Sequence, residues 1–336
     1  MSWLLMAAVA YMAGYISNLV VIGGSHPLEA IMVGVLIGAA LRNFGLIPAG
    51  LKEGLKKFEV PLLWGVVMLG AGFTPEIAKA EPISLVIIFV TMSVGFWFIY
   101  LLGRAGKLPD KLSSLLSVGT TICGGSAIAI TGPLIKAKEE EVSYAVTTVT
   151  MMGFLALLIY PHIGKLIDMS QTAFGIWAGT AIHNTPLVIG AGYMYGDHAG
   201  QVATMVKLTR NIFMIPVALL ISLWYGRRKA IEKRMGKKEV LKAFPWFLFG
   251  YFVMALFRNL RFFTPAWVVN FVKLGKFLVA VGMAGIGMNT DLRNLKNLGM
   301  RPLVVGSLAA VVVALISLSL IGVFSGEIHT PDGMVP

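Results

Sequence analysis

SVGTTICGGSAIAITGPLIKAK, residues 117–138, is an apolar run that glycine, threonine and serine interrupt near its middle. A second run of the same kind, FGIWAGTAIHNTPLVIGAG at 174–192, follows it, and the two align at an offset of 60 residues. Each contains a Gly-Thr turn inside an apolar run, with a second apolar run after the turn. Backbone groups freed by such residues are tolerated in lipid only where they line a cavity or meet a ligand. Two related, interrupted helices therefore predict a binding site near the middle of a membrane.

The same residues have a second interpretation. Small residues also let membrane helices pack closely, and helices rich in Gly and Ala resemble one another by chance. Gly124 and Gly125 alone would favour packing, whereas the second copy, with His183, Asn184 and Pro186, favours a binding site. The pattern predicts a repeat of the inverted type known in transporters and leaves its symmetry open.

Composition fixes the class of protein. Of the 336 residues, 57% are hydrophobic and 13% are charged, and the mean hydropathy is +0.80. A typical soluble domain has roughly 45–50% apolar and about 25% charged residues. These values exclude a soluble enzyme, a nucleic-acid-binding domain and a disordered protein, and they predict an all-α, polytopic membrane protein.

Apolar runs long enough for a membrane helix divide the chain into about 11 segments, two of which are the interrupted ones. No long linker separates them, so we expect a single membrane domain over 1–336, with a broken-helix core around 113–225. The amino-terminal run lacks a basic region and a cleavage site, and we interpret it as a retained membrane segment. The segments lie near 3–22, 28–41, 60–78, 83–103, 113–135, 142–160, 172–194, 202–225, 243–257, 266–288 and 302–324.

The basic residues predict the orientation. The chain has 28 Lys and Arg against 16 Asp and Glu, a net charge of +12. Most of the Lys and Arg fall on one side of the predicted segments, and cytoplasmic loops carry such an excess. With an odd number of segments, this bias places the N-terminus in the cytoplasm, in a protein of the cell inner membrane.

The charges inside the segments favour an anionic ligand. All 16 acidic residues fall in loops or near segment ends, whereas a cation or proton antiporter normally needs a carboxylate inside the membrane. Lys207 and Arg210 lie three residues apart in the apolar run 206–216 and share a helix face. The alternative is that they extend to the interface. His183 is a candidate proton carrier or a simple hydrogen-bonding residue.

We therefore predict a secondary transporter, an exporter of a small inorganic or organic anion such as sulfate or a sulfonate. Alternatives are a cation- or proton-coupled transporter of another solute, a channel, or a non-transporting scaffold. The expected partners are the anion, the lipid bilayer, a coupling proton or sodium ion and a second copy of the chain, with no nucleic acid. No catalytic residue, metal site or cofactor is predicted, and Cys123 is interpreted as a buried, inert thiol. The candidate substrate-binding residues are Thr120, Thr121, Cys123, Ser126, Thr180, His183, Asn184, Thr185, Lys207 and Arg210.

In the stretches 117–138, 174–192 and 206–216 the chain resembles the sulfate exporter family of uncharacterised bacterial inner-membrane proteins, whose name presumes the substrate. The resemblance implies a transporter with two discontinuous helices that cross at the midplane, as in bile-acid–sodium symporters and cation–proton antiporters. Two departures matter, because the family is expected to carry Glu at the positions of Asn184 and Gly132. The residues that agree with the family are Cys123, Gly124, Lys136, His183, Lys207 and Arg210.

Overall fold

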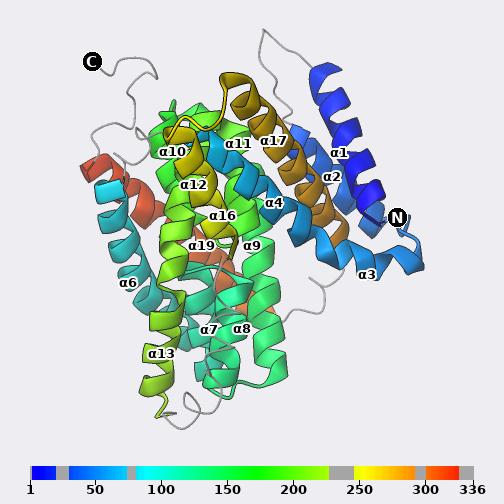
Figure 1. Cartoon of the computed structure of the whole chain (residues 1–336). Helices are drawn as coiled ribbons and strands as arrows, with labels where there is room; N and C mark the ends of the chain where they lie inside the picture. Colours follow the sequence, from blue (N-terminus) through cyan, green and yellow to red (C-terminus); the bar gives the residue numbers. More distant parts are fainter. Residues whose placement is uncertain (1, 20–29, 74–80, 227–245, 292–299, 325–336) are drawn as a thin grey trace. The chain divides into compact units, whose positions relative to one another are not determined.

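The structure is a computed structural model of the whole chain that describes residues 2–19, 30–73, 81–226, 246–291 and 300–324 (Figure 1). Every regular element in these ranges is a helix, which confirms the predicted all-α class for the described part of the chain. The chain forms two compact units. The first unit comprises Met1–Glu76 and Trp246–Asn297, and the second comprises Ile77–Pro245 and Leu298–Pro336. The prediction of a single membrane domain stays a prediction.

The first unit is built around α17 (Pro265–Asn289), which packs against α1 (Ser2–Leu19), α2 (Ala30–Asn43) and α4 (Glu59–Leu69). Thr264 caps α17 by accepting the N–H of Trp267, and proline occupies the first turn, where its missing N–H costs nothing. The remaining described elements of this unit are η1 (Ala49–Leu51), α3 (Lys52–Leu55), η2 (Lys56–Phe58), η3 (Gly70–Gly72) and α16 (Trp246–Asn259).

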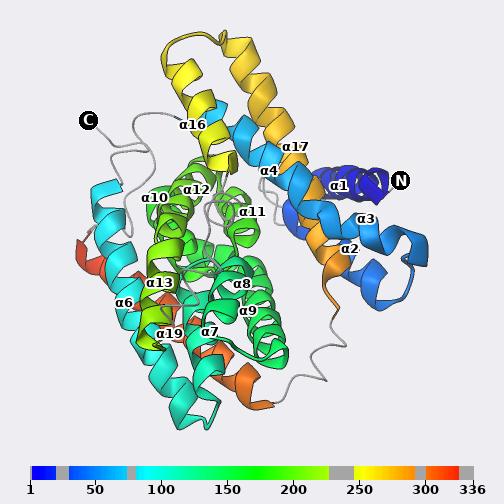
Figure 2. The ribbon, with the colours of Figure 1, turned by 60° about the horizontal axis from the view of Figure 1, so that its bottom comes forward.

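The second unit contains the predicted broken-helix core. Helix α12 packs against both α10 and α11, α9 packs against α7, α8 and α11, and α19 contacts α6, α9 and α10 (Figures 1 and 2). The helices are α6 (Glu81–Ala105), α7 (Asp110–Thr121), α8 (Gly125–Leu134), α9 (Glu139–Leu166), α10 (Gln171–Ala181), α11 (Thr185–Tyr195), α12 (Asp197–Ile212), α13 (Met214–Trp224) and α19 (Met300–Phe324).

Both predicted interruptions are present. The first separates α7 from α8, where Gly124 has φ +66° and ψ −129°, a conformation that only glycine adopts readily. The second separates α10 from α11, where Ile182 and Asn184 are extended and Pro186 lies in the first turn of α11. Each apolar run is therefore two short helices with a non-helical turn between them, as the residue chemistry predicts.

Six helices of the described ranges are long and apolar enough to cross a membrane. The count of about 11 spans is not confirmed, because the half helices α7, α8, α10 and α11 are each too short to cross alone. The six candidate spans are Ser2–Leu19, Ser84–Ala105, Glu139–Leu166, Asp197–Trp224, Pro265–Asn289 and Arg301–Phe324.

Candidate functional site

The two helix breaks meet, and α12 lies against them. We call this region the broken-helix site, defined by residues 120–126 and 180–186 with Lys207 and Arg210 of α12. The backbone N–H of Gly125 donates to Asn184 Oδ1 at 3.3 Å, so the two breaks are in direct contact. The sequence predicted this meeting from the internal repeat, in which residues 124 and 184 are equivalent positions.

Lys207 is fully buried and donates to three backbone carbonyls. Its Nζ lies 2.8 Å from the oxygen of Ile122, 3.2 Å from that of Ile182 and 2.5 Å from that of His183. An ammonium group has three N–H donors, and these three oxygens use all of them. The lysine therefore joins both breaks and does not extend to an interface.

Arg210 makes the same kind of contact one turn further along α12. Its Nε donates to Thr121 O at 2.8 Å and its two terminal nitrogens donate to Thr120 O at 2.8 Å and to Gly179 O at 2.9 Å. The side chain is 1% exposed. The guanidinium thus spans the last turns of α7 and α10.

Helix geometry explains why two cations are stable here. The last carbonyls of a helix have no partner within it, and they carry a partial charge of about −0.5. The oxygens that Lys207 and Arg210 contact belong to the ends of α7 and α10 and to the residues that follow them. Burial without partners would cost several kcal/mol per ion, and these carbonyls offset that cost.

The starts of the half helices α8 and α11 have a different environment. Asn184 Nδ2 donates to Thr150 Oγ1 at 3.4 Å, and Asn211 Nδ2 donates to Thr185 Oγ1 at 3.2 Å. Asn184 and Thr185 are half-buried, as is Gly125. Thus neutral amide and hydroxyl groups, still open to a ligand, surround the two helix starts.

Two buried polar atoms beside the breaks have no described partner. His183 Nδ1 lies 3.2 Å from Thr120 O, which makes it the N–H donor, and Nε2 is left with a lone pair and no hydrogen bond. Asn211 Oδ1 is also without a partner, and its residue is 8% exposed. Both atoms mark places where a water, a proton or a solute group would add a missing hydrogen bond.

The predicted site residues separate into groups. His183, Asn184, Thr185, Lys207 and Arg210 come together as expected, and Thr120 takes part through its carbonyl. Ser126 lies at the start of α8 and is exposed.

The remaining three predicted residues are turned toward other partners. Thr121 Oγ1 donates to Ser117 O, and Thr180 Oγ1 bonds to Ile176 O and to Ser317 of α19. Cys123 is buried with its Sγ 3.3 Å from Met214 Sδ. These side chains support the helices around the breaks.

Sequence reasoning did not include Thr150, Asn211 and Met214 in the site. The signal for Thr150 was present, because the 60-residue offset pairs it with Arg210. Asn211 follows Arg210 directly in the sequence. Within the described ranges no three His, Cys, Asp or Glu side chains are close enough together to hold a metal ion.

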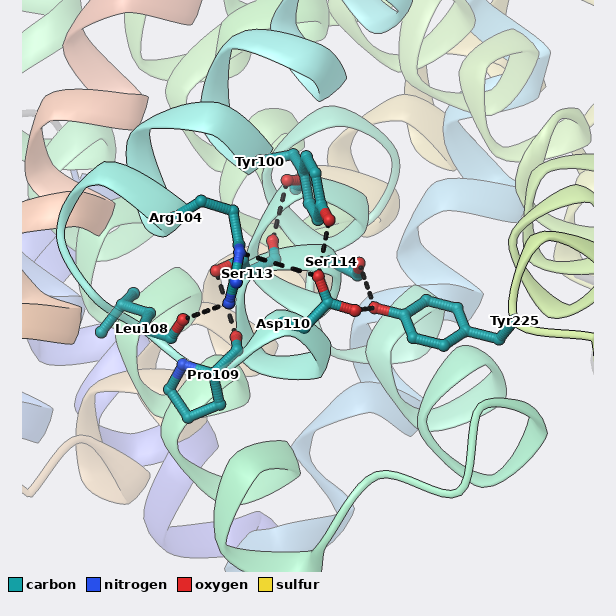
Figure 3. A network of polar contacts seen from close by, with 9 residues as sticks. Tyr100, Arg104, Leu108, Pro109, Asp110, Ser113, Ser114 and Tyr225 are labelled. Carbon is teal, nitrogen blue, oxygen red and sulfur yellow. Dashed lines mark hydrogen bonds and ion pairs between the residues drawn. The ribbon is translucent and has the colours of Figure 1, made fainter.

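A second polar cluster lies at the start of α7 (Figure 3). Tyr100 donates to one carboxylate oxygen of Asp110 at 2.5 Å, and Tyr225 donates to the other. Arg104 Nε lies 3.8 Å from the first oxygen, and Ser114 Oγ lies 3.0 Å from the hydroxyl of Tyr225. Burial raises the pKa of Asp110, but the two tyrosine hydroxyls and the nearby cations lower this pKa by more, so that it lies below the ordinary value of 3.8. The cluster joins the end of α13 to the end of α6 and the start of α7.

Comparisons with known proteins agree with a membrane location. The family described as "Conserved hypothetical protein 698" matches residues 2–306. The chain belongs to this family. It is 31% identical over 329 residues to a UPF0324 membrane protein of Clostridium tetani, with 93% of each chain covered. It is 34% identical over 315 residues to a UPF0324 membrane protein of Streptococcus pneumoniae, covering 89% of this chain and 90% of the relative. The relatives are named as membrane proteins, and these names state no substrate.

Proposed function

We propose that this protein is a secondary transporter that exports a small anion, such as sulfate or a sulfonate, across the cell inner membrane. It works without nucleotide hydrolysis or any chemical step, through about 11 spans, with the N-terminus in the cytoplasm. The anion binds where the half helices α8 and α11 start. Lys207 and Arg210 provide the positive field behind it, and a proton or a sodium ion is the coupling ion.

The charge balance of the broken-helix site supports an anion. Lys207 and Arg210 bring two positive charges, and the carbonyl ends of α7 and α10 offset about one of them, at roughly −0.5 each. The starts of α8 and α11 add about +0.5 each. In the part of the chain that the structure describes, no hydrogen bond or ion pair joins either cation to a carboxylate. The site therefore carries an excess of positive charge that an anion would balance.

The observation that carries the proposal is the contact between the two helix starts at Asn184. Helix starts present free backbone N–H groups and bind anions readily. Here two of them meet at one half-buried amide, with the hydroxyl groups of Thr150 and Thr185 beside it. The donors at this point are neutral, which favours release of the solute as well as binding, because a full counter-charge would trap it.

The two cations have a supporting role in this proposal. Their described N–H bonds go to carbonyls of the breaks. The anion therefore contacts the neutral donors, and Lys207 and Arg210 attract it electrostatically without touching it. Direct contact between either cation and the anion stays a prediction. A cation-coupled transporter of another solute is the second candidate, favoured by the unpartnered Nε2 of His183.

The test is anion binding by the purified protein and by the variant Asn184→Asp. We expect sulfate or a small sulfonate to raise the midpoint of thermal unfolding of the parent in a saturable way. The aspartate carboxylate would occupy the place of the anion, so N184D should be insensitive to added sulfate. Asn259→Asp on α16 is the matched control, because Asn259 is exposed and its one hydrogen bond within the described residues goes to Ala255 O.

The outcomes separate the candidates. Saturable uptake of sulfate into proteoliposomes that responds to an imposed ion gradient supports a secondary transporter. Uptake that does not saturate indicates a channel, and no binding or uptake of any small anion by the parent indicates a scaffold or another solute. If N184D and N259D respond to sulfate as the parent does, the assignment of the helix starts is wrong.

A further inference from the structure

The three carbonyls around Lys207 form a cage. The oxygens of Ile122, Ile182 and His183 lie 2.8, 3.2 and 2.5 Å from Nζ. They come from two segments that are 60 residues apart in the sequence, and both segments directly follow the end of a half helix. Oxygens that converge from separate segments on one point, in a fully buried place, are the arrangement by which proteins replace the water shell of a small cation.

The charge of the cage also fits a single monovalent ion. The ends of α7 and α10 carry about −0.5 each, and together they offset one of the two positive charges that they face, those of Lys207 and Arg210. Unwound carbonyls and half-helix ends are the groups that coordinate a coupling cation in transporters with broken helices. In this chain an ammonium group on a flexible stem occupies that position, and it is attached to α12.

We propose that the ammonium group of Lys207 is a built-in substitute for a coupling cation. The cage of Ile122, Ile182 and His183 is a monovalent-cation site that the protein fills with its own charge, so the parent protein binds no sodium there. Removal of the side chain by Lys207→Ala opens a site for Na⁺ or K⁺. For the proposed transporter, this means that the coupling ion is not a sodium ion bound in the cage. In that respect the inference rests on the proposed function.

In the variant K207A, Arg210 does not take the place of the lysine in the cage. Its short bonds go to the carbonyls of Thr120, Thr121 and Gly179, and it approaches the cage only at Ile182 O, at 3.4 Å. The alanine variant therefore keeps the three cage oxygens and gains the volume of the lysine stem. A sodium ion with a water molecule would satisfy carbonyls that are otherwise left buried without a donor.

The experiment measures cation binding directly, without any transported solute. Purified parent and K207A are titrated with radiolabelled sodium, and their unfolding midpoints are followed in NaCl, KCl and N-methylglucamine chloride at equal ionic strength. We expect K207A to bind sodium or potassium saturably, at about one ion per chain, and to be stabilised by several degrees. The parent should show no difference between the three salts.

Two control variants test whether the cation binds in the space that the Lys207 side chain leaves. In Lys207→Met an uncharged side chain of similar length fills the cage, and it should bind no cation. Lys111→Ala removes a lysine that also donates to a backbone carbonyl, that of Lys136 at 2.6 Å, but at an exposed position and with one described bond. K111A should behave as the parent does. If K207A does not fold in any salt, Lys207→Ser replaces it, because it leaves similar space and its hydroxyl can bond to a water molecule in the cage.

Every outcome bears on the cage alone. A folded K207A or K207S that binds no more Na⁺ or K⁺ than the parent does would overturn the proposal. The proposed function is tested separately, by sulfate stabilisation of the same parent protein. A parent that binds no anion would refute the transporter proposal and leave the cation result valid.

Discussion

Asn184 accepts the backbone N–H of Gly125 at 3.3 Å, so a side chain at the start of α11 caps the start of α8. The same amide donates to Thr150 of α9. One half-buried residue thus connects two half helices and a continuous one. It holds the two positive helix ends close together. These ends repel each other electrostatically unless an acceptor or an anion lies between them.

Gly124→Ala should abolish the packing of the two breaks. Gly124 has φ +66°, and a Cβ at this position would overlap Asn184 Oδ1. We expect a loss of at least about 1–3 kcal/mol from backbone strain alone, with more from the overlap. The neighbouring Gly125→Ala is the control, because its Cβ would lie 3.8 Å from Val146 Cγ1, an ordinary contact. Thermal unfolding in detergent measures both, and equal midpoints would show that this turn is not rigid.

Arg210→Ala should destabilise the second unit by roughly 3–5 kcal/mol, since it removes a buried donor from the carbonyls of Thr120, Thr121 and Gly179, of which Thr120 O keeps the bond from His183. Arg258→Ala is the matched control. Arg258 also donates to two carbonyls, those of Gly72 and Phe73, but it is only half-buried. Similar losses for the two variants in chemical unfolding would contradict the special role of Arg210.

Trp177→Phe should cost about 1 kcal/mol. The indole Nε1 donates to Ala314 O at 3.0 Å and joins α10 to α19, while the ring stacks on Tyr160 with 4.6 Å between centroids. Phenylalanine keeps a ring there but removes the indole donor, so the Ala314 carbonyl keeps only its bond within α19. The exposed Trp97 provides the comparison, and Trp97→Phe should change the unfolding free energy by less than about 0.5 kcal/mol. A neutral Trp177→Phe would show that the link to α19 contributes nothing.

The Asp110 cluster predicts a pH dependence with a definite sign. The pKa of Asp110 is lower in the folded protein than its ordinary value of 3.8. The carboxylate therefore stabilises the folded state at neutral pH, and this contribution is lost as the pH falls through the lowered folded-state value. Asp110→Asn should remove that part of the acid sensitivity, measured as the difference in unfolding midpoint between pH 7 and the acid range.

Tyr225→Phe tests the same cluster from the other side. It removes one of the two hydroxyl donors to Asp110, so the pKa of the carboxyl should rise toward its ordinary value. The acid-dependent loss of stability should then be smaller than in the parent and should be complete at a higher pH, because it ends at the folded-state pKa. If the acid profiles of parent, D110N and Y225F coincide, the carboxylate is not coupled to folding.

The interruptions were predictable from sequence because they depend on local chemistry. Glycine at a positive φ, extended residues before a proline, and threonine within an apolar run all act within a few residues. The half-helix boundaries at Thr121, Gly125, Ala181 and Thr185 fall inside the two stretches that the sequence singled out.

The partners of Lys207 were not predictable in the same way. Its carbonyls lie 85, 25 and 24 residues away along the chain, so their convergence depends on tertiary packing. Thr180 shows the opposite case. A helical threonine commonly donates to the carbonyl four residues earlier, and Thr180 does so to Ile176 O, which argues against its hydroxyl as a ligand.

The sulfur pair of Cys123 and Met214 has a practical consequence. Cys123 is the one cysteine in the sequence, it sits in the first break, and the thioether at the start of α13 lies 3.3 Å from it. A thiol covered in this way reacts with a maleimide only when the surrounding chain opens. The rate of labelling would therefore report how often the break opens. Mass spectrometry can measure this rate in native membranes without an engineered probe.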